Sequence, residues 1–469
     1  MKKLIVFTGF LAGLILFLSA NAIAEDDLTL NDRELENLAK DMKALFDAKT
    51  LDDRSAEMEA TLALTSSLDE VAAKKGIKNV LKYPDAIFRI KELTINTKHK
   101  SARVFKSKAG KGFQENYFED PTDNDRNYKY FVSLPKGYKT GGGDRFPVLI
   151  YLHSETGGGS RVLKDVREEL KLVFNDKELL EKTIILAPVG PVKGKRKVID
   201  AAEDWELLDP GRKTAFIGLR VLLEMMVFDR SRVFIMGMGP SGAVAYKFST
   251  WYPSLFSGAV AVDAPVTSLF YENARDLHLV YISTPQNRKN HAEQAAAMAA
   301  KYPGDNGGTK AIFIDDAEDP GKRSRLATKS IAALNKLMDR APKKTIPTSI
   351  MLRSIDLEFS ANAWLKIDVM NNTASMKIGD EDLPYVDAKV DRESNSFNIT
   401  SNRVGRFRLF LNDKLVDMDK KITVNLNGKK RWEGTKERNM LLMLNMLYEN
   451  WAGDYEVYTN YIDIEEEDA

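Results

Sequence analysis

The chain has 469 residues, of which 43% are hydrophobic and 29% are charged, a composition typical of a globular protein with two or three domains. Its 69 basic and 68 acidic side chains give a formal net charge of +1, so the sequence gives no support to a nucleic-acid partner. It contains no cysteine, which excludes disulfides, a lipoprotein anchor and thiol catalysis.

Residues 1–24 have the pattern of a signal peptide. Lys2 and Lys3 form a basic start, an apolar stretch follows at 4–18, and small-x-small cleavage sites end at Ala22 and Ala24. The alternative is a single membrane anchor, but the apolar stretch is shorter than the roughly 20 residues that a spanning helix needs. We therefore expect cleavage near Ala24, a periplasmic or secreted protein, and no stable membrane anchor afterwards.

Residues 25–125 are predicted to form a helical segment and a lead-in to the next domain. Apolar residues recur at spacings of three and four between Leu35 and Leu45, which is the spacing of one helix face. Asn31 and Glu34 are placed to cap the start of this helix. A second amphipathic stretch runs from about residue 52 to residue 73. The sequence assigns this segment no role.

Residues 126–341 alternate between strand and helix patterns. The run FPVLIYLH (146–153) is apolar throughout, which is typical of a strand buried on both faces. Further strands are predicted at 128–135, 183–189, 232–237, 257–265, 277–284 and 311–315, and helices at 166–174, 214–226, 243–252, 291–301 and 324–338. This alternation predicts an α/β domain with a doubly wound, mostly parallel sheet.

Residues 342–469 have a different pattern: short segments in which apolar and polar residues alternate, separated by turn residues. This pattern predicts a small antiparallel β-sandwich-like domain. A helix predicted at 438–451 closes the chain. Trp364 and Trp432 would suit a carbohydrate, but core packing is their expected role.

The stretch GMGPSG (237–242) joins a predicted strand to a predicted helix. Gly237, Gly239 and Gly242 spell G-x-G-x-x-G, the dinucleotide-binding fingerprint, and Asp263 stands 26 positions after Gly237, beyond the usual spacing of about 20. Such a turn normally opens its domain, whereas several strand–helix units precede it here. A dinucleotide-binding protein stays open as an alternative, although we expect no cofactor.

The same stretch fits a second class of protein. Residues 229–265 (DRSRVFIMGMGPSGAVAYKFSTWYPSLFSGAVAVDAP) resemble the elbow region of the α/β-hydrolase superfamily, in particular secreted bacterial esterases of the feruloyl-esterase and polyhydroxybutyrate-depolymerase kind. FPVLIYLHSETGGGS (146–160) is similar to the strand and glycine loop that supply one oxyanion donor in that family. The resemblance covers about residues 125–340. It implies an α/β-hydrolase fold with a nucleophile elbow, G-x-S-x-G.

In this register the catalytic parts are missing. Gly239 stands at the nucleophile position, and Pro240, which follows it, has no N–H to donate to an oxyanion. Gln286 stands where the resemblance places the catalytic acid. No histidine follows the last predicted strand; the four histidines are His99, His153, His278 and His291. We interpret the domain as a degenerate esterase and do not assign it an enzymatic activity.

Ser241 is the remaining candidate nucleophile. As a displaced nucleophile it would make the chain an active serine hydrolase, acting on carbohydrate esters or similar substrates. Without a base in reach it would be weakly activated, and capping the helix is its expected role. The acidic residues at 315–319 match no EF-hand spacing, so no metal site is expected.

A crevice at the carboxyl ends of the strands persists in such a fold after catalysis is lost. We therefore expect a ligand-binding or interaction role, with a small molecule, an ester or a carbohydrate as the ligand. The oligomeric state is left open. The expected lining is Ser154, Glu155, Gly157, Gly158, Gly159, Gly239 and Ser241, with Gln286 beside them.

Overall fold

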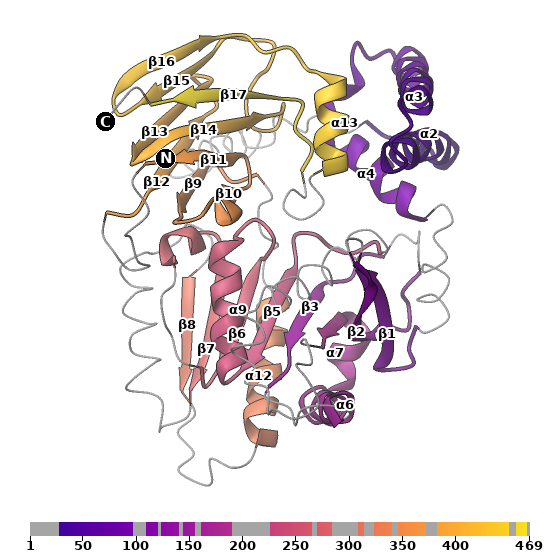
Figure 1. The fold of residues 1–469 in the computed structure, drawn as a ribbon, viewed down its shortest axis with the longest axis vertical. Helices are drawn as coiled ribbons and strands as arrows, with labels where there is room; N and C mark the ends of the chain where they lie inside the picture. The colour runs from indigo at the N-terminus through magenta and orange to yellow at the C-terminus, as the bar shows by residue number, and fades with distance from the viewer. Residues whose placement is uncertain are drawn as a thin grey trace, which may run out of the picture.

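The computed structural model describes residues 28–96, 109–120, 123–139, 144–154, 161–189, 226–264, 270–283, 308–313, 323–339, 346–371, 382–449 and 456–466. They form an N-terminal group of helices, a large sheet flanked by helices, and two further sheets (Figure 1). The predicted signal peptide, the helix at 291–301 and, apart from Met226, the helix at 214–226 lie outside the described residues. Within them, every helix is too short or too polar to span a bilayer.

The N-terminal helices are α2 (Asp32–Thr50), α3 (Arg54–Lys75) and α4 (Pro84–Asn96), with a short 3-10 helix, η1 (Val80–Lys82), before α4. The expected cap of α2 is confirmed. The Glu34 N–H donates to Asn31 Oδ1 at 3.0 Å, and the Asn31 N–H donates to Glu34 Oε2 at 2.9 Å. The sequence reading missed α4, although Pro84 at its first position is a recognised start signal.

These helices share a hydrophobic core with a helix from the other end of the chain, α13 (Met440–Glu449). Met443 and Leu444 of α13 are buried in that core, and Figure 1 shows α13 beside α2 and α4. The expectation that this helix closes the chain is wrong. A further strand, β17 (Asn460–Glu465), follows it and pairs with β14 (Val404–Leu411), because Ile462 and Ile464 alternate into the core of the C-terminal sheets.

The large sheet has the strand order β1-β2-β4-β3-β5-β6-β7-β8. Its strands are β1 (Gln114–Asp120), β2 (Asp123–Ser133), β3 (Val148–Leu152), β4 (Ile184–Pro188), β5 (Val233–Met238), β6 (Gly258–Val262), β7 (His278–Ser283) and β8 (Gly308–Phe313). Every pair among β3 to β8 is parallel, whereas β1–β2 and β2–β4 are antiparallel. The predicted mostly parallel sheet is therefore confirmed, with β1 as an unpredicted edge strand.

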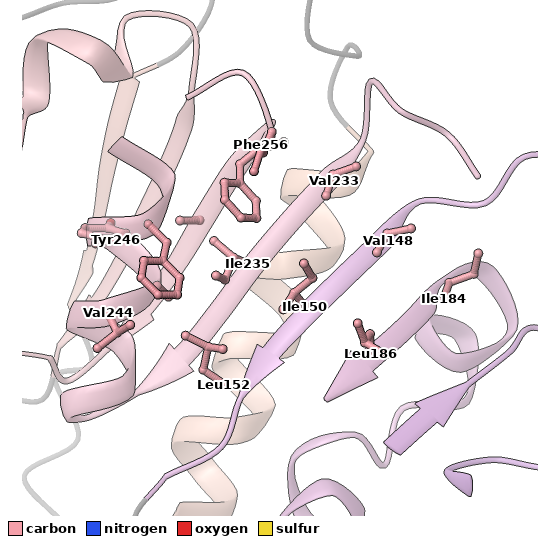
Figure 2. Close-up of a cluster of buried hydrophobic side chains, with 14 of the residues drawn as sticks. Val148, Ile150, Leu152, Ile184, Leu186, Val233, Ile235, Val244, Tyr246 and Phe256 are labelled. Carbon is pink, nitrogen blue, oxygen red and sulfur yellow. The ribbon is translucent and has the colours of Figure 1, made fainter. Parts of the chain in front are cut away.

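Helices cover both faces of this sheet, as a doubly wound fold requires. One face packs against α9 (Pro240–Trp251), and the other against α6 (Val162–Val173) and α12 (Arg323–Met338), while the short α7 (Lys177–Lys182) leads into β4. Figure 2 shows Val244 and Tyr246 of α9 lying over Ile235 of β5 and Leu152 of β3. Because both faces are buried, these strands read in the sequence as continuous apolar runs.

The C-terminal sheets form the expected sandwich around one core. One contains β10 (Ala361–Asn362), β11 (Leu365–Met370), β14 and β17; the other contains β16 (Lys429–Gly434), β15 (Ile422–Leu426), β13 (Ser396–Asn402), β12 (Tyr385–Asp391) and β9 (Ser349–Arg353). The sandwich is not wholly antiparallel, because β13 and β15 run parallel. Trp364 has no exposed surface and donates its Nε1–H to the Pro347 carbonyl at 2.6 Å, so its role is core packing.

The N-terminal helices and the C-terminal sandwich both attach to the large sheet at the amino ends of its strands. Glu92 of α4 is 7% exposed and accepts hydrogen bonds from Arg145 Nη1 at 2.9 Å and Nη2 at 2.5 Å; Arg230 Nε lies 3.8 Å from it. On the sandwich side, Asn273 exchanges two hydrogen bonds of 2.9 and 2.7 Å with the Arg353 backbone. Arg145, Arg230 and Asn273 each precede a strand (β3, β5 and β7), so these attachments lie opposite the turn that follows β5.

Candidate functional site

The turn from β5 into α9 has an unusual backbone at its apex. Gly239 is the N-cap of α9, with φ 60° and ψ −133°, a conformation that side-chain-bearing residues rarely adopt. α/β-Hydrolases place their nucleophile on a sharp, strained strand-to-helix turn of this kind. The backbone of Gly239 therefore has the form of a nucleophile elbow without the side chain.

The glycines of this turn fall into two kinds. A Cβ on Gly237 would lie 2.2 Å from the Ser241 carbonyl oxygen, and a Cβ on Gly242 would lie 2.8 Å from Ala264 Cβ, so both positions exclude a side chain. A Cβ on Gly239 would meet no atom within 4 Å. The flanking glycines are thus required for close packing, whereas the apex has open space where a nucleophile would project.

Two backbone N–H groups of the turn, those of Gly239 and Gly242, are bound within the fold. The Gly239 N–H donates to the Val262 carbonyl at 2.7 Å, and the Gly242 N–H donates to the Gly239 carbonyl at 2.9 Å. Pro240, the first residue of α9, has no N–H. An oxyanion at the apex therefore lacks the donor that the residue after the nucleophile normally supplies.

Ser241 is held inside the fold. Its side chain has no exposed surface, and its hydroxyl donates to the His153 carbonyl at 2.5 Å. This contradicts two expectations. Ser241 does not cap α9, whose N-cap is Gly239 without a side-chain hydrogen bond, and it does not line an open crevice. Its hydroxyl instead joins the first turn of α9 to the carboxyl end of β3.

His153 is 2% exposed at the end of β3. Its Nδ1–H donates to the Ser154 carbonyl at 2.7 Å. Burial lowers the pKa of His153 below its usual value, and the Ser154 carbonyl and the charge of Glu169 oppose this shift in part. A neutral, buried imidazole bonded to the adjacent backbone has a structural role.

Glu169 on α6 is a residue that the sequence reading missed. Its Oε1 accepts hydrogen bonds from the Tyr151 hydroxyl at 2.5 Å and from the Ser154 N–H at 2.9 Å. The Ser154 N–H is thereby bound within the fold at the carboxyl end of β3. Nothing in the helix-forming segment around Glu169 signals this contact, because its partners lie on a strand that precedes the helix.

Of the expected crevice residues, the structure places Ser154 and Gly239, both half-buried, at the carboxyl ends of the neighbouring strands β3 and β5. Glu155, Gly157, Gly158, Gly159 and Gln286 lie outside the described residues, as do His99, His291 and the acidic cluster at 315–319. Across the described ranges, no group of three or more His, Asp or Glu side chains is arranged to hold a metal ion.

No family model matches the sequence, and no curated protein matches it. Similar solved structures include a thermostable esterase (17% identity, TM-score 0.38, 48% of this chain and 63% of the esterase covered). Another is an S-formylglutathione hydrolase from Agrobacterium tumefaciens (12% identity, TM-score 0.36, 49% of this chain and 96% of the hydrolase covered). A third is a ferulic acid esterase (13% identity, TM-score 0.32, 48% of this chain and 98% of the esterase covered). The chain thus spans less than two thirds of the thermostable esterase.

Because all three TM-scores are below 0.5, the fold class rests on this chain's own geometry. A mostly parallel sheet with helices on both faces, and a sharp glycine-flanked turn from β5 into α9, define an α/β-hydrolase fold. A β-rich sandwich is appended to it.

Proposed function

We propose that this chain is an exported esterase-like protein that has lost serine-hydrolase catalysis and keeps its fold for binding or interaction. The observation that carries the proposal is Gly239. It has the elbow backbone and open space in front of it, but no side chain to attack a substrate. Pro240 removes the neighbouring oxyanion donor, a loss that typically costs about 100- to 1000-fold in rate.

The position of Ser241 supports this proposal over an active hydrolase with a displaced nucleophile. A nucleophile must reach the substrate and be activated by a base. The Ser241 hydroxyl has no exposed surface and donates a hydrogen bond to the backbone carbonyl of His153. To attack, it would have to break this bond and move α9 away from β3.

The contacts of the turn also disfavour dinucleotide binding. In such proteins the glycine turn offers its N–H groups to a pyrophosphate. Here the N–H groups of Gly239 and Gly242 already donate to backbone carbonyls, and Pro240 has none. The three glycines are better explained by elbow packing than by phosphate binding.

The ligand we propose is a polar small molecule, such as a sugar or an ester, at the carboxyl ends of β3 and β5. Ser154 and Gly239 are the described residues that would face it. The described contacts that hold the N-terminal helices and the sandwich lie at the opposite ends of the strands, away from this edge.

The test is labelling with a fluorophosphonate probe, which forms an adduct only with an activated serine. The mature protein, its Ser241→Ala variant and an active esterase are treated together, and intact mass and peptide mapping locate any adduct. We expect no adduct on the protein beside full labelling of the esterase. A stoichiometric adduct on Ser241 that disappears in Ser241→Ala would refute the proposal in favour of an active hydrolase.

A further inference from the structure

A cavity of about 530 Å³ lies between the N-terminal helices and the C-terminal sandwich. Its described lining comes from residues 28–89 on one side and 392–417 on the other, and none of these residues belongs to the large sheet. A volume of this size is typical of small-molecule sites, which range over about 300–1,000 Å³. The cavity is separate from the elbow, because the parts that line it join the sheet at the amino ends of its strands.

The carboxylates in the cavity wall are already neutralised. Asp85 pairs with Lys414 at 2.5 Å, and Asp417 pairs with Lys420 at 2.8 Å. Asp413 accepts two hydrogen bonds from Arg438, one of them at 2.9 Å. A cationic ligand would have to displace these partners, so the acids of the wall do not define a cation site.

Two donors in the wall have no such partner within the described part of the chain. The exposed guanidinium of Arg89 on α4 forms no hydrogen bond or close ion pair with any described residue; it interacts at longer range with the charge of Glu92, which Arg145 already binds. The hydroxyl of the half-buried Tyr83 has no hydrogen-bond partner among the described residues either. On the opposite wall, Arg392 gives one N–H to the Asp413 carbonyl at 3.2 Å and has further N–H groups. Guanidinium groups bind carboxylates and phosphates with two parallel hydrogen bonds.

The apolar part of the wall indicates an organic anion and not an inorganic one. Leu28, Pro84 and Ala86 lie in the lining beside these donors, so the cavity offers apolar surface as well as charge. A lone inorganic ion would leave most of the volume unfilled. An anion with a sugar-sized body would contact the apolar wall and the donors together.

We propose that this cavity binds a small organic anion, sugar-sized and bearing a carboxylate or phosphate, with Arg89 as its anchor. Arg89 and Tyr83 belong to the helical segment and Arg392 belongs to the sandwich, so the ligand bridges the two parts. Binding therefore stabilises the junction between them. The inference does not depend on the elbow and goes beyond the function proposed above.

The test is isothermal titration of the mature protein with glucuronate, with glucose as the neutral sugar of the same ring size and with inorganic phosphate. We expect saturable binding of glucuronate, no binding of glucose, and a higher melting temperature with glucuronate present. Arg89→Gln should weaken binding by about ten-fold or more, since it removes a charged hydrogen-bonding group. Competition by phosphate would place phosphorylated sugars in the same ligand class.

The matched control is Arg54→Gln. Arg54 is also an exposed arginine of the helical segment, but it starts α3, and the length of α2, about 28 Å, separates it from the cavity wall at Leu28. The Arg54→Gln variant should bind glucuronate with the affinity of the native protein. The proposal is overturned if glucose binds with the same affinity as glucuronate, or if Arg89→Gln and Arg54→Gln bind glucuronate with the same affinity. It is also overturned if neither glucuronate nor phosphate binds at millimolar concentration.

Discussion

Placing a serine at Gly239 tests whether the turn is built as the geometry indicates. In Gly239→Ser the new Cβ enters open space, so the cost is that of placing a side chain at φ 60°, about 1–3 kcal/mol of unfolding free energy. Gly237→Ala, two positions earlier, places a Cβ 2.2 Å from the Ser241 carbonyl oxygen and 2.4 Å from its carbon. These are backbone atoms of α9, so we expect Gly237→Ala to cost about 3 kcal/mol or more.

The assay combines urea unfolding, followed by circular dichroism, with fluorophosphonate labelling. Gly239→Ser should remain folded and lose less stability than Gly237→Ala. It should label far more slowly than an active esterase, because Pro240 still withholds the oxyanion N–H and this alone costs about 100- to 1000-fold.

Either of two results would refute this reasoning. If Gly239→Ser lost as much stability as Gly237→Ala, the apex would not be the open position that the structure shows. If Gly239→Ser labelled as fast as an active esterase, the absence of the serine would be the only defect, and the role given to Pro240 would be wrong.

Three further predictions concern buried polar groups. His153 has a lowered pKa, so below about pH 6.5 the unfolded chain takes up a proton that the folded chain does not bind, and stability falls. Urea unfolding of the native protein and of His153→Gln at pH 7.5 and 5.5 should show a larger acid loss in the native protein. Asn273→Ala removes both hydrogen bonds to the Arg353 backbone and a third to the Thr250 carbonyl, and should cost about 2–4 kcal/mol in the same assay. Asn273→Asp should cost at least as much, because a buried carboxylate cannot donate to these two carbonyls. Glu92→Gln should lower the free energy of unfolding by about 2 kcal/mol, less than breaking a fully buried ion pair does, because the Arg145 side chain is 37% exposed. A loss below about 0.5 kcal/mol would mean that the Glu92–Arg145 pair does not hold α4.

The large sheet was predictable because its signals are local. Strands buried on both faces read as apolar runs, as Val148–Leu152 does, and the capping box at Asn31 lies within four residues of sequence. Each such segment carries its own pattern, whatever it packs against. The elbow glycines were also readable, because a strand, a tight turn and a helix follow one another directly.

The parts that were missed depend on partners distant in sequence. The core shared by α13 and the N-terminal helices joins the two ends of the chain, and no local pattern indicates which apolar face meets which. The parallel pair β13–β15 and the strand β17 likewise follow from tertiary pairing. At a helix start a serine usually caps the helix, which is what the sequence predicts for Ser241, but its hydroxyl donates instead to a carbonyl 88 positions earlier.

The elbow separates what the fold needs from what catalysis needs. Gly237 and Gly242 have no room for a side chain, so packing of α9 against the sheet is enough to retain them. The apex has room for a serine but carries glycine, which adopts φ 60° with the least strain. A serine there would carry strain that only a catalytic benefit offsets. Glycine at the apex, followed by proline, is therefore the arrangement expected where the fold is needed and the nucleophile is not.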